Sequence, residues 1–171
     1  PGVLDNDVTV SVTGYGPVNE GSSYAMFTVT GSKGDELTLT LGNTATSSDR
    51  DATISGFTIE YSTDGTTWTT YSAGTKPTVP GVLGTSGTGD VFVRVNVTTE
   101  QDTNYEGAET FTLTATSVAS TSKTASATTS IVDNGTGDKY GPDIDPSSPS
   151  TPSAPGVLDN DVTVSVTGYG P

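Results

Sequence analysis

Residues 36–41 read Glu-Leu-Thr-Leu-Thr-Leu, with leucine at every second position and threonine between the leucines. Successive side chains of a β-strand point to opposite faces, so this stretch places its leucines on one face and its threonines on the other. Such alternation is typical of a strand with one face in a core and the other in water. β-Branched threonine also favours extended backbone. The stretch therefore predicts a half-buried strand of a β-sheet.

Further runs on both sides of this strand alternate in the same way, and Gly, Asn, Asp and Ser separate them. Asp64-Gly65 lies between two runs and predicts a hairpin turn, while Lys76–Asp90 is rich in Gly and Pro and predicts a surface loop. Because no segment shows a 3.6-residue period, we expect an all-β fold, namely an antiparallel immunoglobulin-like sandwich of seven to nine strands. The predicted strands are Val8–Thr13, Tyr24–Thr30, Glu36–Leu41, Gly56–Ser62, Thr67–Tyr71, Val91–Val97, Glu109–Thr116 and Lys123–Val132.

The two ends of the sequence are identical, since residues 1–17 and residues 155–171 both read PGVLDNDVTVSVTGYGP. Identity over this length indicates tandem copies whose period is the size of a whole domain. We expect a β-sandwich module over 1–134, in which 1–7 are the tail of the preceding linker. A Pro- and Asp-rich linker, stiff because of its prolines, is expected over 135–160. Residues 161–171 are then the truncated first strand of the next copy, ordered by strand exchange or end-to-end contact between copies, or by a cation in the joint.

Charge and composition narrow the class of ligand. The chain has 20 acidic and 6 basic residues and a formal net charge of −14. This is the wrong sign for nucleic acid or an anionic membrane surface, and no stretch approaches the roughly 18–20 apolar residues of a membrane span. Cys and His are both absent, which excludes thiolate and imidazole ligands. Oxygen ligands remain, and they favour a hard cation.

Acidic residues gather in four segments at predicted strand ends and loops: VNEG, SSDRD, EQDTNYEGAETF and IVDNGTGD. Ca²⁺ takes six to eight oxygen ligands, more than any one of these segments supplies. A sandwich brings loops that are distant in sequence to one end, so the segments together provide enough oxygens. The alternative is that these are ordinary solvated carboxylates. The residues in question are Glu20, Asp49, Asp51, Glu100, Asp102, Glu106, Glu109, Asp133 and Asp138.

VNEG before a strand, YEGAETFTL in the middle and a closing IVDNG together resemble the Calx-β family over roughly residues 7–134. The resemblance implies an immunoglobulin-like sandwich with Ca²⁺ bound at one tip. For Glu109, a strand-edge carboxylate that accepts backbone hydrogen bonds is an equal alternative. The ligand positions that the resemblance implies are Glu20, Asp102, Glu106 and Asp133, with Glu109 as the second acidic residue of the central motif and Asp49 or Asp51 in a ligand-bearing loop.

An acidic, threonine-rich array of such modules is also similar to the extender repeats of large repeats-in-toxin (RTX) adhesins, which type I secretion exports to the surface of Gram-negative bacteria. That similarity implies Ca²⁺ between neighbouring modules, where it stiffens the chain. The alternative is a soluble acidic linker without bound ions. The candidate interdomain ligands are Asp5, Asp7, Asp138, Asp143, Asp145, Asp159 and Asp161.

These observations predict an extracellular, non-enzymatic spacer that holds a distal binding region away from the cell. Its partners would be the neighbouring identical repeats of the same chain. The alternative is an adhesin module that binds a glycan or a protein weakly and gains strength from many copies. Tyr24, Tyr61, Tyr71 and Tyr105 would be the candidates to line a sugar site. An enzyme is disfavoured because a small sandwich offers no obvious cleft for paired carboxylates.

Overall fold

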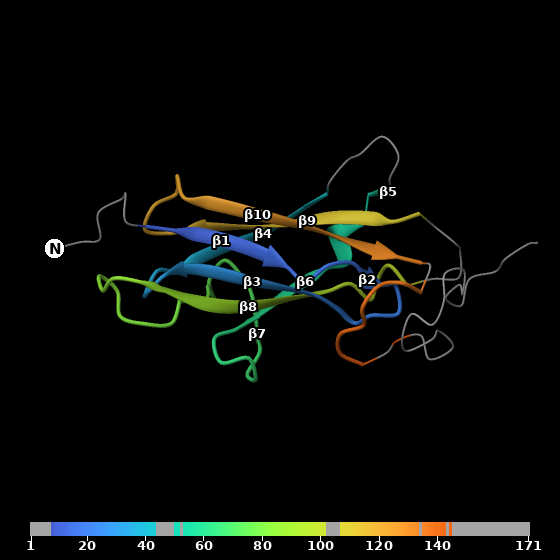
Figure 1. The fold of residues 1–171 in the computed structure, drawn as a ribbon, viewed down its shortest axis with the longest axis horizontal. Helices are drawn as coiled ribbons and strands as arrows, with labels where there is room; N and C mark the ends of the chain where they lie inside the picture. Colours follow the sequence, from blue (N-terminus) through green and yellow to red (C-terminus); the bar gives the residue numbers. More distant parts are fainter. Residues whose placement is uncertain are drawn as a thin grey trace, which may run out of the picture.

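The computed structural model describes residues 8–43, 50–51, 53–101, 107–133, 135–142 and 144, with the backbone alone for 50–51. Two β-sheets lie face to face (Figure 1), which confirms the predicted all-β sandwich. The first sheet has the order β1 (Val10–Gly14), β3 (Tyr24–Ser32), β8 (Thr88–Asn96), β6 (Thr58–Ser62) and β7 (Thr69–Thr70). The second has the order β2 (Val18–Asn19), β10 (Thr124–Val132), β9 (Glu109–Ser117) and β4 (Leu37–Asn43), and β5 (Arg50–Asp51) also pairs with β9. A 3₁₀ turn, η2 (Ile54–Gly56), precedes β6.

The second sheet is mixed, whereas the sequence predicted antiparallel pairing throughout. Strand β2 runs parallel to β10, and β5 runs parallel to β9. Both strands are two residues long and lie outside the predicted runs. After β1 the chain passes Gly16, which has a φ of 105°, and continues as β2 along the edge of β10. Because β1 and β10 run in the same direction, this crossing from one sheet to the other gives a parallel pair.

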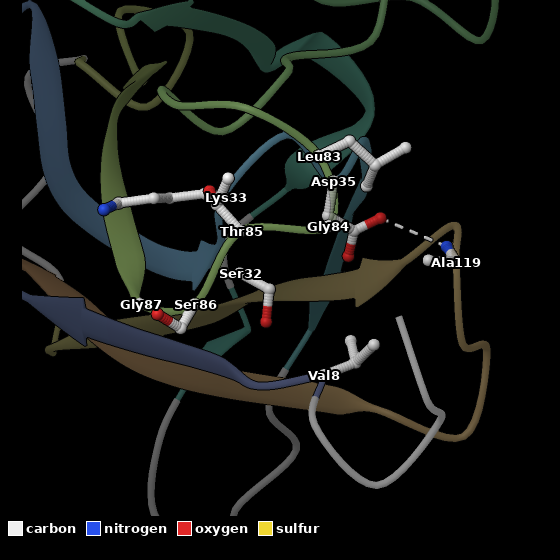
Figure 2. Close-up of a pocket in the computed structure, with 10 residues that line it drawn as sticks. All are labelled: Val8, Ser32, Lys33, Asp35, Leu83, Gly84, Thr85, Ser86, Gly87 and Ala119. Atoms are coloured by element: carbon white, nitrogen blue, oxygen red, sulfur yellow. Dashed lines mark hydrogen bonds between the residues drawn. The ribbon is translucent and has the colours of Figure 1, made fainter. Parts of the chain in front are cut away.

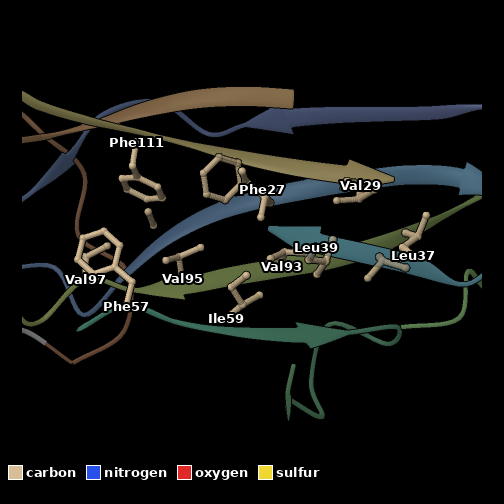
Figure 3. Packing of buried hydrophobic residues seen from close by; sticks show 14 of the residues in the cluster. Phe27, Val29, Leu37, Leu39, Phe57, Ile59, Val93, Val95, Val97 and Phe111 are labelled. Carbon is tan, nitrogen blue, oxygen red and sulfur yellow. The ribbon is translucent and has the colours of Figure 1, made fainter. Parts of the chain in front are cut away.

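The core lies between the sheets and is made by alternate residues of the long strands. In β3 and β9, buried and half-buried side chains alternate along the strand, as the period of two predicts. Three phenylalanines join the layers (Figure 3): the ring of Phe111 lies 6.0 Å from that of Phe27 and 5.2 Å from that of Phe57, in edge-to-face arrangements. Such pairs add to the stabilisation from apolar burial.

The sandwich has two distinct ends (Figure 1). At the end where β1 begins, called the entry end, β3 turns into β4 between Ser32 and Leu37. At the other end, called the exit end, β10 finishes beside β2. Strand β3 runs nine residues between them, which corresponds to about 30 Å at the rise of a β-strand.

The chain after β10 is bonded to the exit end. Residues 135–142 and 144, called the docked segment, lie against residues 17–24, so the predicted linker begins with residues that pair with the module. The Ser22 hydroxyl accepts the Tyr140 N–H at 2.8 Å, and the Ser23 hydroxyl donates to the carbonyl of Pro142. Four backbone bonds complete the contact: Asp138 N–H to Pro17 O (3.0 Å), Asn19 N–H to Asp138 O (2.8 Å), Tyr24 N–H to Tyr140 O (3.2 Å) and Ile144 N–H to Gly21 O (3.0 Å).

The predicted hairpin at Asp64-Gly65 is confirmed, since β6 pairs antiparallel with β7 and Gly65 has a φ of 76°. The Asp64 carboxylate accepts the N–H groups of Thr67 and Thr66, each at 2.7 Å. These bonds, first that of Thr67, hold the pKa of Asp64 well below its ordinary value.

The predicted loop Lys76–Asp90 is more ordered than its composition indicates. Thr78 forms a bridge with Glu36, Val79 is fully buried, and β8 already begins at Thr88. Its backbone therefore closes the entry end against the turn between β3 and β4.

Candidate functional site

Three of the acidic residues predicted to bind Ca²⁺ are buried at the exit end. The exposed fractions of Glu20, Glu109 and Asp133 are 4%, 9% and 7%. Acidic side chains are rarely buried to this degree unless another group compensates their charge. The three residues therefore differ from the solvated loop carboxylates that the alternative interpretation predicted.

Three adjacent strands of the second sheet position these carboxylates. Glu20 follows β2 and its N–H donates to the carbonyl of Val132, the last residue of β10, at 3.1 Å. Asp133 comes directly after Val132. Glu109 begins β9 opposite Ile131 of β10. The sandwich thus brings residues from three distant segments to one end of one sheet.

The predicted Ca²⁺ centre falls only in part on described residues. Asp51 is described by its backbone in β5, while Asp49, Asp102 and Glu106 lie outside the described residues. Within the described ranges, no group of three or more acidic, His or Cys side chains is placed to hold a metal ion. Glu20, Glu109 and Asp133 each take part in a further interaction within the chain.

Of the predicted interdomain ligands, Asp138 alone lies among the described residues. Its backbone is part of the docked segment and its side chain is exposed. The Tyr140 hydroxyl donates to Asp138 Oδ2 at 3.3 Å. Partial burial, and then the negative charge of Asp138, raise the pKa of Tyr140. Asp5, Asp7, Asp143, Asp145, Asp159 and Asp161 lie outside the described residues, as does the predicted extra strand within 161–171.

Asn19 is a polar residue of the exit end that the sequence analysis did not single out. It is 1% exposed, and its Oδ1 accepts the N–H of Gly21 at 3.0 Å. Its Nδ2 has no hydrogen-bond partner among the described residues. The only sequence signal was its place in VNEG directly before Glu20, and nothing in that tetrapeptide indicates burial.

The outer face of the first sheet carries a stack of aromatic rings around Arg94. The guanidinium lies 4.2 Å from the ring centroid of Tyr24 and 4.3 Å from that of Trp68, and its Nε donates to Glu60 at 2.7 Å. Cation–π contacts of this kind occur both in structural and in ligand-binding roles. Tyr15 is 44% exposed, and its hydroxyl shares a hydrogen bond with the Thr28 hydroxyl at 2.7 Å.

The other tyrosines proposed for a sugar site have structural contacts where they are described. Tyr61 and Tyr71 pack against the core, and the Tyr71 hydroxyl accepts the Leu39 N–H at 3.0 Å. Tyr105 lies outside the described residues. Of the three that are described, Tyr24 alone belongs to the outer-face stack.

No protein-family model matches the chain, and no curated protein matches it. Over the residues that the structure describes, no helix is both long and apolar enough to cross a membrane.

Proposed function

We propose that this chain is a Ca²⁺-stabilised structural extender repeat of a surface adhesin of a Gram-negative bacterium, exported by type I secretion. Many copies in series would project a distal binding region from the cell. The module itself would contribute length and stiffness and no catalysis.

The observation that carries this proposal is that the chain enters and leaves the sandwich at opposite ends. The chain enters β1 at one end of the sandwich and passes through the docked segment at the other end, about 30 Å away. Copies joined in this way lie head to tail, and each repeat adds its full length to the array. The identity of residues 1–17 with residues 155–171 supports such an array.

Ca²⁺ is supported by the acidity of the exit end and of the whole chain. Glu20, Glu109 and Asp133 are buried at the same end of adjacent strands, and a bound cation would offset the cost of burying their negative charges. The net charge of −14 and the absence of His and Cys favour a hard cation with oxygen ligands. Extracellular Ca²⁺ would saturate sites with a Kd of about 10⁻⁴–10⁻³ M, whereas cytosolic Ca²⁺ would leave them empty. The module would then fold after export.

The test is the melting temperature of the 171-residue chain in Ca²⁺ and in chelator. Ca²⁺ at about 100 times its Kd adds about 2.7 kcal/mol to the free energy of unfolding, which corresponds to a rise of about 10 °C. Asp133→Asn should remove most of this rise. Glu36→Gln, which removes an exposed carboxylate at the entry end, should retain it. An unchanged melting temperature of the natural chain on chelation would refute the Ca²⁺ role.

A glycan- or protein-binding module is the second candidate, and the stack of Tyr24, Arg94 and Trp68 favours it. Aromatic faces beside a cation suit the apolar faces and hydroxyls of sugars. A glycan array probed with several linked repeats measures this directly. Specific hits that Trp68→Ala abolishes would put binding ahead of the spacer role, and an array without hits would leave the spacer as the sole proposal.

A further inference from the structure

The entry end contains a pocket of about 450 Å³ (Figure 2), at the opposite end of the sandwich from Glu20, Glu109 and Asp133. It is bounded by the start of β1, by the turn after β3, by the loop before β8 and by the turn between β9 and β10. The residues that line it include Val8, Ser32, Asp35, Leu83, Thr85 and Ala119.

The backbone holds Asp35 at the wall of this pocket. The Asp35 N–H donates to the carbonyl of Ser32 at 3.1 Å, and the Asp35 carbonyl accepts the Val79 N–H at 2.8 Å. Gly34 has a φ of 76°, and a Cβ there would lie 2.3 Å from the backbone nitrogen of Leu83. Only glycine allows this approach, which brings the loop of Leu83 over the Asp35 side chain.

The Asp35 carboxylate is buried with one oxygen unused. Its side chain is 2% exposed, and Oδ1 accepts the Ala119 N–H at 3.1 Å. Oδ2 is buried and has no hydrogen-bond partner among the described residues. Figure 2 shows this second oxygen directed away from Ala119, into the space between Ser32 and Val8. Lys33 also lines the pocket, but its ammonium group points away from Asp35.

A buried carboxylate oxygen without a partner is strongly unfavourable unless a cation or a proton neutralises it. The same pocket is lined by Ser32, Thr85 and Ser86, which carry hydroxyls, and by the apolar side chains of Val8 and Leu83. Carboxylate and hydroxyl oxygens suit a hard divalent cation, and the flexible geometry of Ca²⁺ suits loop-borne ligands better than the strict octahedron of Mg²⁺.

We propose that Asp35 and this pocket form a second Ca²⁺ site, at the entry end, independent of the site proposed at the exit end. A single carboxylate makes the site weak, with a Kd of about 10⁻³ M, because ligand charge sets affinity. A bound ion would tie together the turn at Asp35, the loop at Thr85 and the turn at Ala119. In the head-to-tail array proposed above, on which this point rests, these three segments would face the preceding repeat.

The test is a Ca²⁺ titration of the ¹⁵N-labelled 171-residue chain, followed by amide NMR. In the natural chain the amides of Thr85, Gly87 and Ala119 should shift, with half-saturation at millimolar Ca²⁺. Asp35→Asn keeps the Oδ1 acceptor for Ala119 but removes the charge, and it should abolish these shifts. The adjacent Glu36→Gln, which removes an exposed charge, should preserve them.

Two outcomes would overturn the proposal: equal shifts in Asp35→Asn and in the natural chain, or the same shifts with Na⁺ at matched ionic strength. If Asp35→Asn does not fold, Mn²⁺ added to the natural chain decides instead. Broadening at Thr85 and Ala119 supports the site, and broadening confined to amides near Glu20 and Asp133 overturns it. Because the two ends are followed by separate amides, failure here is distinguishable from failure of the exit-end site.

Discussion

Replacing Gly137 by alanine should detach the docked segment from β2. A Cβ at this position would lie 2.3 Å from the backbone nitrogen of Asn19 and 2.3 Å from the carbonyl carbon of Val18. Both atoms belong to β2, which β10 holds in place by parallel pairing. Because neither atom can withdraw without breaking that pairing, the docked segment has to move.

The expected loss follows from the bonds on either side of Gly137. Asn19 N–H to Asp138 O and Asp138 N–H to Pro17 O, at 2.8 and 3.0 Å, would both break. Each backbone bond contributes about 1 kcal/mol net, and a buried donor left without a partner adds about 1–3 kcal/mol. We expect the free energy of unfolding to fall by about 2–4 kcal/mol, which lowers the melting temperature by about 5–15 °C.

Thermal unfolding followed by circular dichroism, at fixed Ca²⁺, measures this change. Gly42→Ala is the matched control, because a Cβ there meets no atom within 4 Å, and it should be close to neutral. Hydrogen exchange of the Asn19 amide should accelerate in Gly137→Ala alone. A melting temperature within about 2 °C of the control, together with a protected Asn19 amide, would refute the reasoning.

Two further substitutions test the fold. Asp64→Asn should lower the melting temperature at pH 7, because the pKa of Asp64 is depressed in the fold. The stabilisation by the ionised Asp64 carboxylate is present above the unfolded pKa of about 3.9 and is lost as pH falls towards the folded pKa. A gap between variant and natural chain that stays constant from pH 7 to pH 2 would contradict this. Phe111→Ala should reduce the free energy of unfolding by about 3–5 kcal/mol, because Phe111 is fully buried between two other rings. The control Thr40→Ala, at an exposed position of β4, should change it by less than about 0.5 kcal/mol. Similar losses for both variants in denaturant titrations would contradict the core assignment.

The long strands could be predicted from sequence because their period of two reflects a core on one side. ELTLTL and ETFTLTAT became β4 and β9, with Leu37, Leu39, Leu113 and Phe111 buried in the core. The short strands β2 and β5 carry no such period, since two residues cannot show one. They exist because β10 and β9 offer free backbone groups at their edges, which is a property of the folded sheet.

The docked segment and the buried Asp35 were harder to predict from sequence, because both depend on contacts between distant segments. Motif spacing indicated that Glu20, Glu109 and Asp133 share one end, and all three lie there. The docked segment is held mainly through its backbone, so its Gly-rich sequence indicated only a linker. Asp35 follows a Gly in a short turn, and its burial depends on the distant loop at Leu83.

Small-angle scattering of a chain of two complete repeats, joined by residues 135–160, tests the spacer proposal most directly. Ca²⁺ bound at the joint should restrict bending, so the radius of gyration and the maximum dimension should rise on addition of millimolar Ca²⁺ and fall again in chelator. A single 171-residue chain measured in parallel separates stiffening of the joint from folding of the module. Superimposable curves for the two-repeat chain with and without Ca²⁺ would contradict a Ca²⁺-stiffened extender.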